Sequence, residues 1–399
     1  MDETSLKTSI AGKLDFEMNT DSYIELSEKN LAHNIRVIRE IIGESTRLSS
    51  VVKGNAYGHG LAPFLEMALA CGIDHFAVAN AFEARQIAPI LEGKASIMVM
   101  GIYGEQDVEW FIQNEIEIYI GSLDQLKLVI QKAKIVGKKA RVHLEIETGL
   151  NRLGLEEQAL QAATDLILSH PNEVALFGVC SQLSGVGKPG NEQRVESQYQ
   201  NFDRVLTGLR EAGLNPRYTH IDSSISTLTC FRSEHNMVRI GTAQYGIYVN
   251  YYDNIQQAGN IQAQLKRVMT WKSKVYSIRA VPSGGQVGYG MSQDDGQTRR
   301  IAIIPVGYFD GYRRYMPEKS HVLIRGQKAP ILGLVSMNSS CVDITDIKDV
   351  EVGDEVILLG GTGDLKVDPE SFFPKHHYVN GIEFPSRIHP NIPRIITKN

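Results

Sequence analysis

The segment SSVVKGNAYGHG (residues 49–60) joins an apolar, β-branched run to a cluster of residues that are typical of tight turns. The valines before Lys53 favour a strand, whereas the asparagine and glycines after it favour a turn. The segment therefore predicts a strand that carries Lys53 at its carboxyl end. Whether this lysine is simply solvated or has a chemical role depends on the sheet to which the strand belongs.

Eight apolar runs of this kind occur in about the first 240 residues, and amphipathic segments with helical spacing separate most of them. The runs cover residues 47–53, 75–80, 96–101, 115–121, 141–147, 174–180, 218–224 and 236–241. Strands that alternate with helices favour parallel βαβ units, and eight units match a closed (β/α)8 barrel better than an open sheet. We therefore predict an α/β fold built on a TIM-type barrel.

The pattern changes after about residue 260, where short apolar runs are separated by glycine, proline and aspartate rather than by helical segments. Such a pattern is typical of an all-β domain. We expect a barrel over residues 22–259, a mostly β domain over 260–399, and a polar N-terminal extension over 1–21.

Composition excludes several classes of function. The formal net charge is −5, so nothing in the overall charge favours nucleic acid or an anionic membrane surface. No apolar run approaches the ~18 residues of a membrane span, and residues 1–21 lack the pattern of a secretory signal. Four scattered cysteines without a CxxC pair suit a reducing compartment, so we expect a cytoplasmic protein.

Two motifs resemble ligand sites only superficially. SGVGKP (residues 184–189) lacks the first glycine and the final Ser or Thr of a phosphate-binding loop, since Gln182 and Pro189 stand at those positions. KHHY (residues 375–378) holds two histidines without a carboxylate or cysteine at ligand spacing. We expect no metal site.

Polar residues gather where the predicted barrel strands end, and this end is the active-site face of such barrels. Lys53 ends the first strand. The loops after the seventh and eighth strands often hold a phosphate group in these folds. Besides Lys53, the residues expected on this face are Glu145, Glu147, Arg152, His220, Ser223, Ser224, Arg239 and Gly241.

The sequence resembles the alanine racemases, a family of fold-type III pyridoxal-phosphate enzymes, over nearly the whole chain. The segments that carry the resemblance are VVKGNAYGHG (51–60), EIETGLNRLG (145–154), VRIGTAQYG (238–246), VGYG (287–290) and PVGYFDGYRR (305–314). The resemblance implies pyridoxal 5'-phosphate as the cofactor, a small amino acid as the substrate, and a homodimer with shared active sites.

The resemblance also implies roles for individual residues. Lys53 would bind the cofactor aldehyde and act as one acid/base, and Tyr289 from the partner subunit would act as the other, on the opposite face of the substrate. Arg239, supported by His220, would face the pyridine nitrogen, which stays neutral because arginine cannot accept a proton. The phosphate would be held by Tyr57, Ser224, Gly241 and Thr242. Arg152 would contact both cofactor and substrate, lying against the cofactor O3′ or Tyr289. Tyr308 would narrow the entrance, and the backbone at Met337 would contact the substrate carboxylate.

The chain departs from the family pattern at four positions. Glu145 replaces a lysine that is often carbamylated, and we expect its carboxylate to supply the same negative charge beside Arg152. Gln182, Asn338 and Ile382 replace a histidine, an aspartate and a tyrosine. These changes leave open a racemase for serine or for a broader set of amino acids.

Two other activities stay open on the same scaffold. A decarboxylase of this fold carries a cysteine where this chain has VGYG, and a non-catalytic cofactor-binding protein lacks the second domain. Both are disfavoured here by Tyr289 and by the β domain. We therefore expect an amino-acid racemase that interconverts L- and D-alanine.

Overall fold

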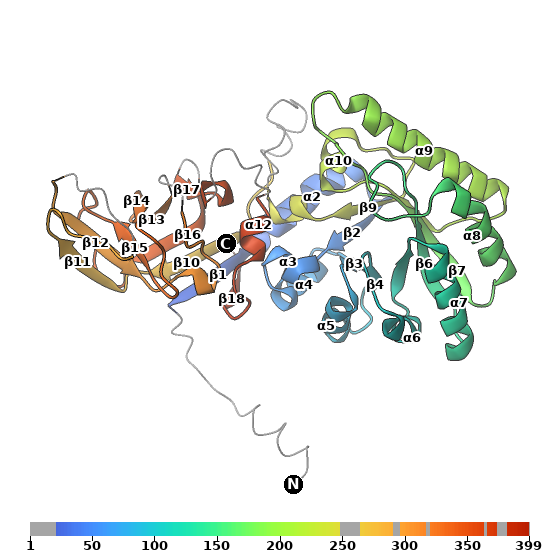
Figure 1. Cartoon of the computed structure of the whole chain (residues 1–399), viewed down its shortest axis with the longest axis horizontal. Coiled ribbons are helices and arrows are strands. Elements are labelled where there is room, and N and C mark those ends of the chain that lie inside the picture. The colour runs from blue at the N-terminus through green and yellow to red at the C-terminus, as the bar shows by residue number, and fades with distance from the viewer. Residues whose placement is uncertain are drawn as a thin grey trace, which may run out of the picture.

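The computed structural model describes residues 21–247, 264–289, 296–316, 320–362, 365–372 and 381–398. Figure 1 shows a barrel surrounded by helices and, beside it, a β domain. Most of the N-terminal extension and the KHHY motif lie outside the described residues, so the expectations for them stay untested.

Eight parallel strands form a nearly closed barrel, which confirms the predicted fold class. All eight match the apolar runs, and in sheet order each lies beside its neighbour in sequence, with the first also beside the eighth. An isolated bridge between Ser223 and Arg239 brings the remaining edges together. The strands are β2 (Arg47–Val51), β3 (His75–Val78), β4 (Ser96–Val99), β5 (Glu117–Ile120), β6 (Ala140–Glu145), β7 (Val174–Cys180), β8 (Tyr218–His220) and β9 (Met237–Ile240).

Helices cover the outside of the barrel with their apolar faces. In α7 (Leu123–Val136) the buried residues Leu126, Val129, Ile130 and Ala133 follow helical spacing, so one stripe faces the strands. The other helices are α2 (Glu28–Ile42), α4 (Leu61–Ala70), α5 (Ala81–Leu91), α6 (Glu105–Gln113), α8 (Glu157–Ser169), α9 (Glu192–Glu211) and α10 (Ser224–Cys230).

The second sheet is mostly antiparallel and belongs to the β domain. Its strands are β10 (Met269–Lys274), β11 (Ser277–Val281), β12 (Arg299–Ile304), β13 (His321–Ile324), β14 (Gln327–Leu332), β15 (Ser340–Asp343), β16 (Glu355–Thr362), β17 (Leu365–Val367) and β18 (Arg394–Thr397). Short helical turns, η1 (Thr242–Tyr245), η3 (Tyr308–Asp310), η4 (Pro369–Phe372) and α12 (Glu383–Ser386), connect the elements.

One N-terminal strand also lies in the second sheet. The expected barrel range began at residue 22, but β1 (Ser22–Ser27) pairs with β10 and β18 of the β domain. Its burial alternates, with Ile24 and Leu26 inside, whereas β3, β4 and β5 are buried almost throughout. A half-buried strand suits an antiparallel sheet, and a parallel barrel needs strands that are buried on both faces. The alternation therefore explains where β1 lies.

The segment after β2 is a left-handed turn. Gly54, Asn55, Ala56 and Tyr57 have φ values between 52° and 62°, although the segment Lys53–Tyr57 is labelled α3 in Figure 1. Left-handed residues other than glycine cost roughly 1–2 kcal/mol each, so neighbouring groups must hold the turn in place.

Two side chains from elsewhere in the fold hold this turn. The Glu83 carboxylate, on α5, accepts hydrogen bonds from the backbone N–H groups of Gly54 (2.6 Å) and Ala79 (2.8 Å). Arg394, on β18, donates to the carbonyl oxygen of Gly58 through Nη2 (2.9 Å) and Nε (3.2 Å). The barrel and the β domain therefore both fix the position of Lys53.

The turn also packs directly against α12. A Cβ atom on Gly58, whose φ is +85°, would lie 1.9 Å from the carbonyl oxygen of Pro385. Only a glycine permits this approach of two backbones. Gly54 is also left-handed, but a Cβ atom there would meet nothing within 4 Å.

We expect Gly58→Ala to lower the free energy of unfolding by about 2–4 kcal/mol, because the methyl group forces α12 away from the turn. Gly54→Ala is the matched control, and it should cost only about 1 kcal/mol from the left-handed backbone. Urea unfolding of both variants measures the difference. Equal losses for the two would show that the contact with α12 contributes nothing.

Candidate active site

A cavity of about 440 Å³ lies at the carboxyl ends of the barrel strands. Most of the predicted site residues line it, and they come from the carboxyl ends of four strands, β2, β6, β8 and β9, or from the segments that follow them. The predicted residues found there are Lys53, Tyr57, Arg152, Ser223, Ser224, Arg239, Gly241 and Thr242, and their neighbours include Met100, Leu150 and Gln182.

Lys53 is held in this cavity directly after β2. Its amine forms no hydrogen bond with the described part of the chain. Burial lowers its pKa below the ordinary value, and the positive charges of Arg152 and Arg239 lower the pKa further, while Glu83 opposes them. A lysine in these surroundings gives up its proton more easily than a lysine at the surface, so its amine is suited to nucleophilic or base chemistry.

One corner of the cavity has space and donors for an anionic group. The Ser224 hydroxyl accepts hydrogen bonds from the backbone N–H groups of Gly241 (2.9 Å) and Ala243 (3.3 Å). The Tyr57 oxygen lies 2.7 Å from where a Cβ atom on Gly241 would stand. That oxygen has no hydrogen-bond partner among the described residues, and burial raises its pKa, so it stays a donor. Tyr57, Ser224 and the loop at Gly241–Thr242 could hold a phosphate group.

Arg239 forms the inner wall of the cavity and is only 5% exposed. Its Nη1 donates to Nδ1 of His220 (2.8 Å) and to the His220 carbonyl (2.9 Å). Its Nη2 donates to the carbonyl of Ser181 (2.7 Å) and to Oε1 of Gln182 (3.2 Å). The Nε donor has no partner in the described structure, so it remains available to a bound molecule. His220 therefore supports Arg239, as predicted.

Glu145 is buried at the end of β6, but its carboxylate forms no ion pair or hydrogen bond with any described residue. Burial raises its pKa, and the charges of Arg239 and Arg152 only partly oppose this effect. Glu147 instead shapes the loop, since it accepts hydrogen bonds from the backbone N–H groups of Gly149 and Asn151. The structure therefore shows no direct Glu145–Arg152 contact.

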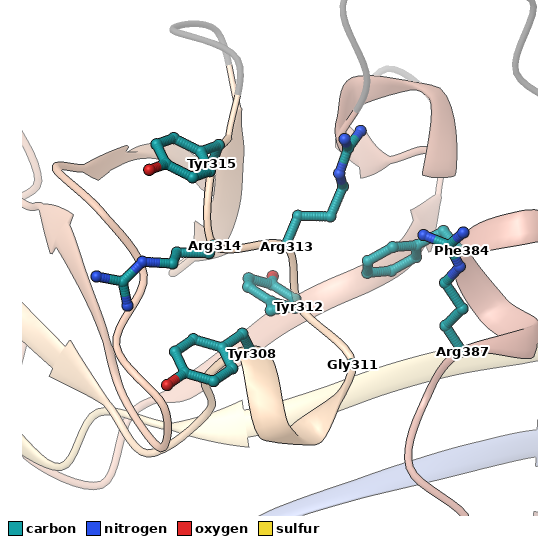
Figure 2. Close-up of a pocket in the computed structure, with 8 residues that line it drawn as sticks. All are labelled: Tyr308, Gly311, Tyr312, Arg313, Arg314, Tyr315, Phe384 and Arg387. Atoms are coloured by element: carbon teal, nitrogen blue, oxygen red, sulfur yellow. The ribbon is translucent and has the colours of Figure 1, made fainter.

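The remaining predicted residues, Tyr289, Tyr308 and Met337, lie on the β domain and do not line the cavity with Lys53. The Arg314 guanidinium carbon is 5.7 Å from the centre of the Tyr289 ring and 5.6 Å from that of Tyr308. Figure 2 shows Tyr308 and Arg314 at a pocket of about 320 Å³, their side chains directed to the same side. Tyr289 is 74% exposed, so in the single chain it faces outward.

Four residues that support the site were not predicted from the sequence: Glu83, Glu117, His143 and Arg394. The motif N-x-x-E at residues 80–83 is a helix-start signal that could have drawn attention to Glu83. Glu117 and His143 are polar residues within apolar strands, and this pattern could have drawn attention to them. No local signal shows that Arg394 reaches Gly58, because the two lie far apart in the sequence.

Among the described residues, no set of three His, Cys, Asp or Glu side chains is placed to hold a metal ion. No helix in this part of the chain is both long and apolar enough to cross a membrane.

Comparison with known proteins gives a consistent result. The domain family described as "Alanine racemase, N-terminal domain" matches residues 26–249. The domain family described as "Alanine racemase, C-terminal domain" matches residues 268–396. The alanine racemase of Methylacidiphilum infernorum is 30% identical over 392 residues, which cover 95% of this chain and 93% of that protein. The alanine racemase of Clostridium novyi is 30% identical over 382 residues, covering 94% and 95%.

Solved structures agree over the whole fold. The alanine racemase of the D-cycloserine producer Streptomyces lavendulae has a TM-score of 0.86 and 26% identity, and the match covers 96% of this chain and 98% of that one. The alanine racemase of Clostridium difficile 630 has a TM-score of 0.85 and 26% identity, covering 96% and 97%. The two domain matches, the relatives and the solved structures all indicate one family. The chain therefore belongs to the alanine racemase family of amino-acid racemases.

Proposed function

We propose that this protein interconverts L- and D-alanine with pyridoxal 5'-phosphate as its cofactor. The observation that carries the proposal is the placement of a buried lysine with a lowered pKa in the same cavity as an arginine with a free Nε donor. Membership of the alanine racemase family supports the choice of substrate. The division at residues 259 and 260 and the cytoplasmic location stay predictions.

The residues present fit the cofactor. Tyr57, Ser224, Gly241 and Thr242 would hold its phosphate, because Gly241 leaves the space in front of the Tyr57 oxygen that a side chain would fill. The Nε donor of Arg239 suits a neutral ring nitrogen, and Lys53 suits the aldehyde. When bound, the cofactor supplies an electron-accepting ring that makes the α-proton of the amino acid acidic.

The protein's own groups remove the α-proton from one face of the substrate and supply a proton on the opposite face. Lys53 takes or returns the α-proton on one face, which its lowered pKa favours at neutral pH. Inversion needs a second acid/base on the opposite face, and we assign this role to Tyr289. Because Tyr289 is exposed and does not line the cavity with Lys53, it would act in the cavity of a second copy. The active unit would then be a homodimer.

Arg152 and Arg239 act on the charge of the site. Both line the cavity and both lower the pKa of Lys53. Arg239 has hydrogen-bond donors only, so a ring nitrogen beside it would accept a hydrogen bond and stay neutral, and the ring would withdraw fewer electrons from the substrate. This arrangement favours return of the proton at the α-carbon over side reactions. Tyr308 and Met337 would border the substrate from the β domain of the second copy.

Incubation of the protein and cofactor with a panel of L-amino acids should give D-alanine fastest, as measured by chiral chromatography. Borohydride reduction of the protein with bound cofactor should attach the cofactor irreversibly to Lys53, and this attached cofactor is the label. Lys53→Ala should lose both the label and the activity. Lys127→Ala, an exposed lysine on α7, is the control that should keep both. Faster turnover of serine would redirect the substrate assignment, and labelling of another lysine would reject the role of Lys53.

Mixing inactive Lys53→Ala with inactive Tyr289→Phe should restore activity through mixed dimers. Random exchange makes half of the dimers mixed, each with one intact site of two, so recovery should reach about a quarter of wild-type activity. The double variant mixed with Lys53→Ala is the control, since no site in it is intact. No recovery after verified subunit exchange would mean that each site is built from a single chain.

Glu145→Gln should lower kcat roughly tenfold, about 1.4 kcal/mol of barrier, because it removes a negative charge near Arg239 and Arg152. Wild-type activity should be equal in carbonate-free and bicarbonate-supplemented buffer, since a carboxylate needs no carbon dioxide. Steady-state kinetics in both buffers measure these effects. Unchanged kcat in Glu145→Gln would show that this carboxylate has no part in catalysis.

A further inference from the structure

A group of charged and polar side chains lies inside the barrel, beneath the cavity. His75 on β3, Glu117 on β5 and His143 on β6 are each at most 1% exposed, and none of them lines the cavity. Barrel interiors are usually filled with branched apolar side chains, so a buried carboxylate here needs an explanation.

These residues connect to Arg239 through a chain of hydrogen bonds. Oε2 of Glu117 lies 2.9 Å from Nε2 of His143, whose Nδ1 lies 2.8 Å from Nε2 of His220. Nδ1 of His220 lies 2.8 Å from Nη1 of Arg239. A side branch runs from the same Glu117 oxygen to Nε2 of His75 (3.0 Å), and Nδ1 of His75 lies 2.9 Å from the Ser49 hydroxyl.

The direction of each hydrogen bond between Arg239 and Glu117 follows from the chemistry of Arg239. A guanidinium group has donors only, so Nδ1 of His220 must accept, and the ring proton of His220 is on Nε2. That proton is donated to Nδ1 of His143, so the ring proton of His143 is also on Nε2 and is donated to Glu117. All three donors therefore point from Arg239 toward the Glu117 carboxylate.

The charges agree with this direction. Arg239 is a buried cation that forms no ion pair with a carboxylate in the described structure, and Glu117 is a buried anion. Burial raises the pKa of Glu117, but the hydrogen bonds from His143 and His75 outweigh it and hold the pKa below its ordinary value. Burial lowers the pKa of both His143 and His220, which keeps their rings neutral. Two neutral rings thus link one cation to one anion.

We propose that Glu117 is a positioning residue for Arg239, because it ends a one-directional hydrogen-bond chain that fixes the tautomers of His143 and His220. With both Nη groups held by the protein, the guanidinium keeps its Nε donor directed to the cavity. This role rests on the proposed function, since Arg239 is expected to face the cofactor ring. His75 also forms a hydrogen bond with Glu117, but it is not one of the residues that connect Glu117 to Arg239. Its loss should therefore disturb packing without altering the hydrogen bonds between Glu117 and Arg239.

The test compares three full-length variants. Glu117→Leu removes the terminal acceptor. Glu117→Gln keeps an amide oxygen that can accept the same two bonds, so it is the conservative rescue. His75→Leu is the matched control, because it removes an equally buried partner of the same carboxylate from the side branch. Nitrogen-15 NMR of the histidine rings reads the tautomers before and after cofactor is added, and a spectrophotometric titration gives the cofactor Kd.

In wild type and in His75→Leu, His143 and His220 should each show a single tautomer with the proton on Nε2. In Glu117→Leu the two rings should show mixed tautomers, the cofactor Kd should rise at least tenfold, and kcat should fall at least tenfold. Glu117→Gln should keep the tautomers and stay within about threefold of wild type, and His75→Leu within about twofold.

Other results would overturn the proposal. A different tautomer of either ring in wild type, or equal changes in Glu117→Leu and His75→Leu, would mean that Glu117 acts only in packing. The tautomers are also read before cofactor is added. They therefore test the hydrogen bonds between Glu117 and Arg239 even if the wild type binds no pyridoxal 5'-phosphate. Failure of that binding would instead count against the proposed function.

Discussion

The left-handed turn from Gly54 to Tyr57 is the constraint on which the site depends. A strand that ends in the ordinary way would continue past Lys53 into a helix on the outside of the barrel. The turn instead keeps Lys53 and Tyr57 at the cavity, and it is unfavourable for every residue in it except glycine. Glu83 on one side and Arg394 on the other supply the hydrogen bonds that stabilise it. The position of the lysine is therefore a property of both domains.

Electrostatics then gives each group in the cavity its chemical character. Burial and two nearby arginines lower the pKa of Lys53, whereas burial raises the pKa of Glu145, and the same two arginines only partly oppose that effect. The Nη groups of Arg239 donate hydrogen bonds to backbone carbonyl oxygens, Gln182 and His220, and its charge helps to lower the pKa of Lys53. Each of these effects comes from the placement of a few charges in partly buried surroundings, where charges interact more strongly than at the surface.

Much of the fold could be predicted from the sequence. All eight barrel strands were found because strands buried on both faces are continuous apolar runs, and the cavity residues came together because parallel strands end at one face. The expected barrel range wrongly included β1, which comes directly before helix α2, although its alternating burial suits the other sheet. The contacts of Glu83, Glu117 and Arg394 were not predicted, because each joins segments that only the folded chain brings together. The proposed action of Tyr289 beside Lys53 would need a second copy of the chain, and the structure of one copy does not test it.

The pairing of β1 with β18 also has a consequence for synthesis on the ribosome. Residues 22–27 are made before every strand of the barrel, whereas their parallel partner, residues 394–397, is made after all of them. The barrel strands can pair beforehand, because domains generally fold in the order in which they are translated. The bond from Arg394 to Gly58, in contrast, forms only after residue 394 leaves the ribosome. The lysine turn therefore gains the support of Arg394 only after every strand of the barrel has been made, so its two supports form at different stages of synthesis.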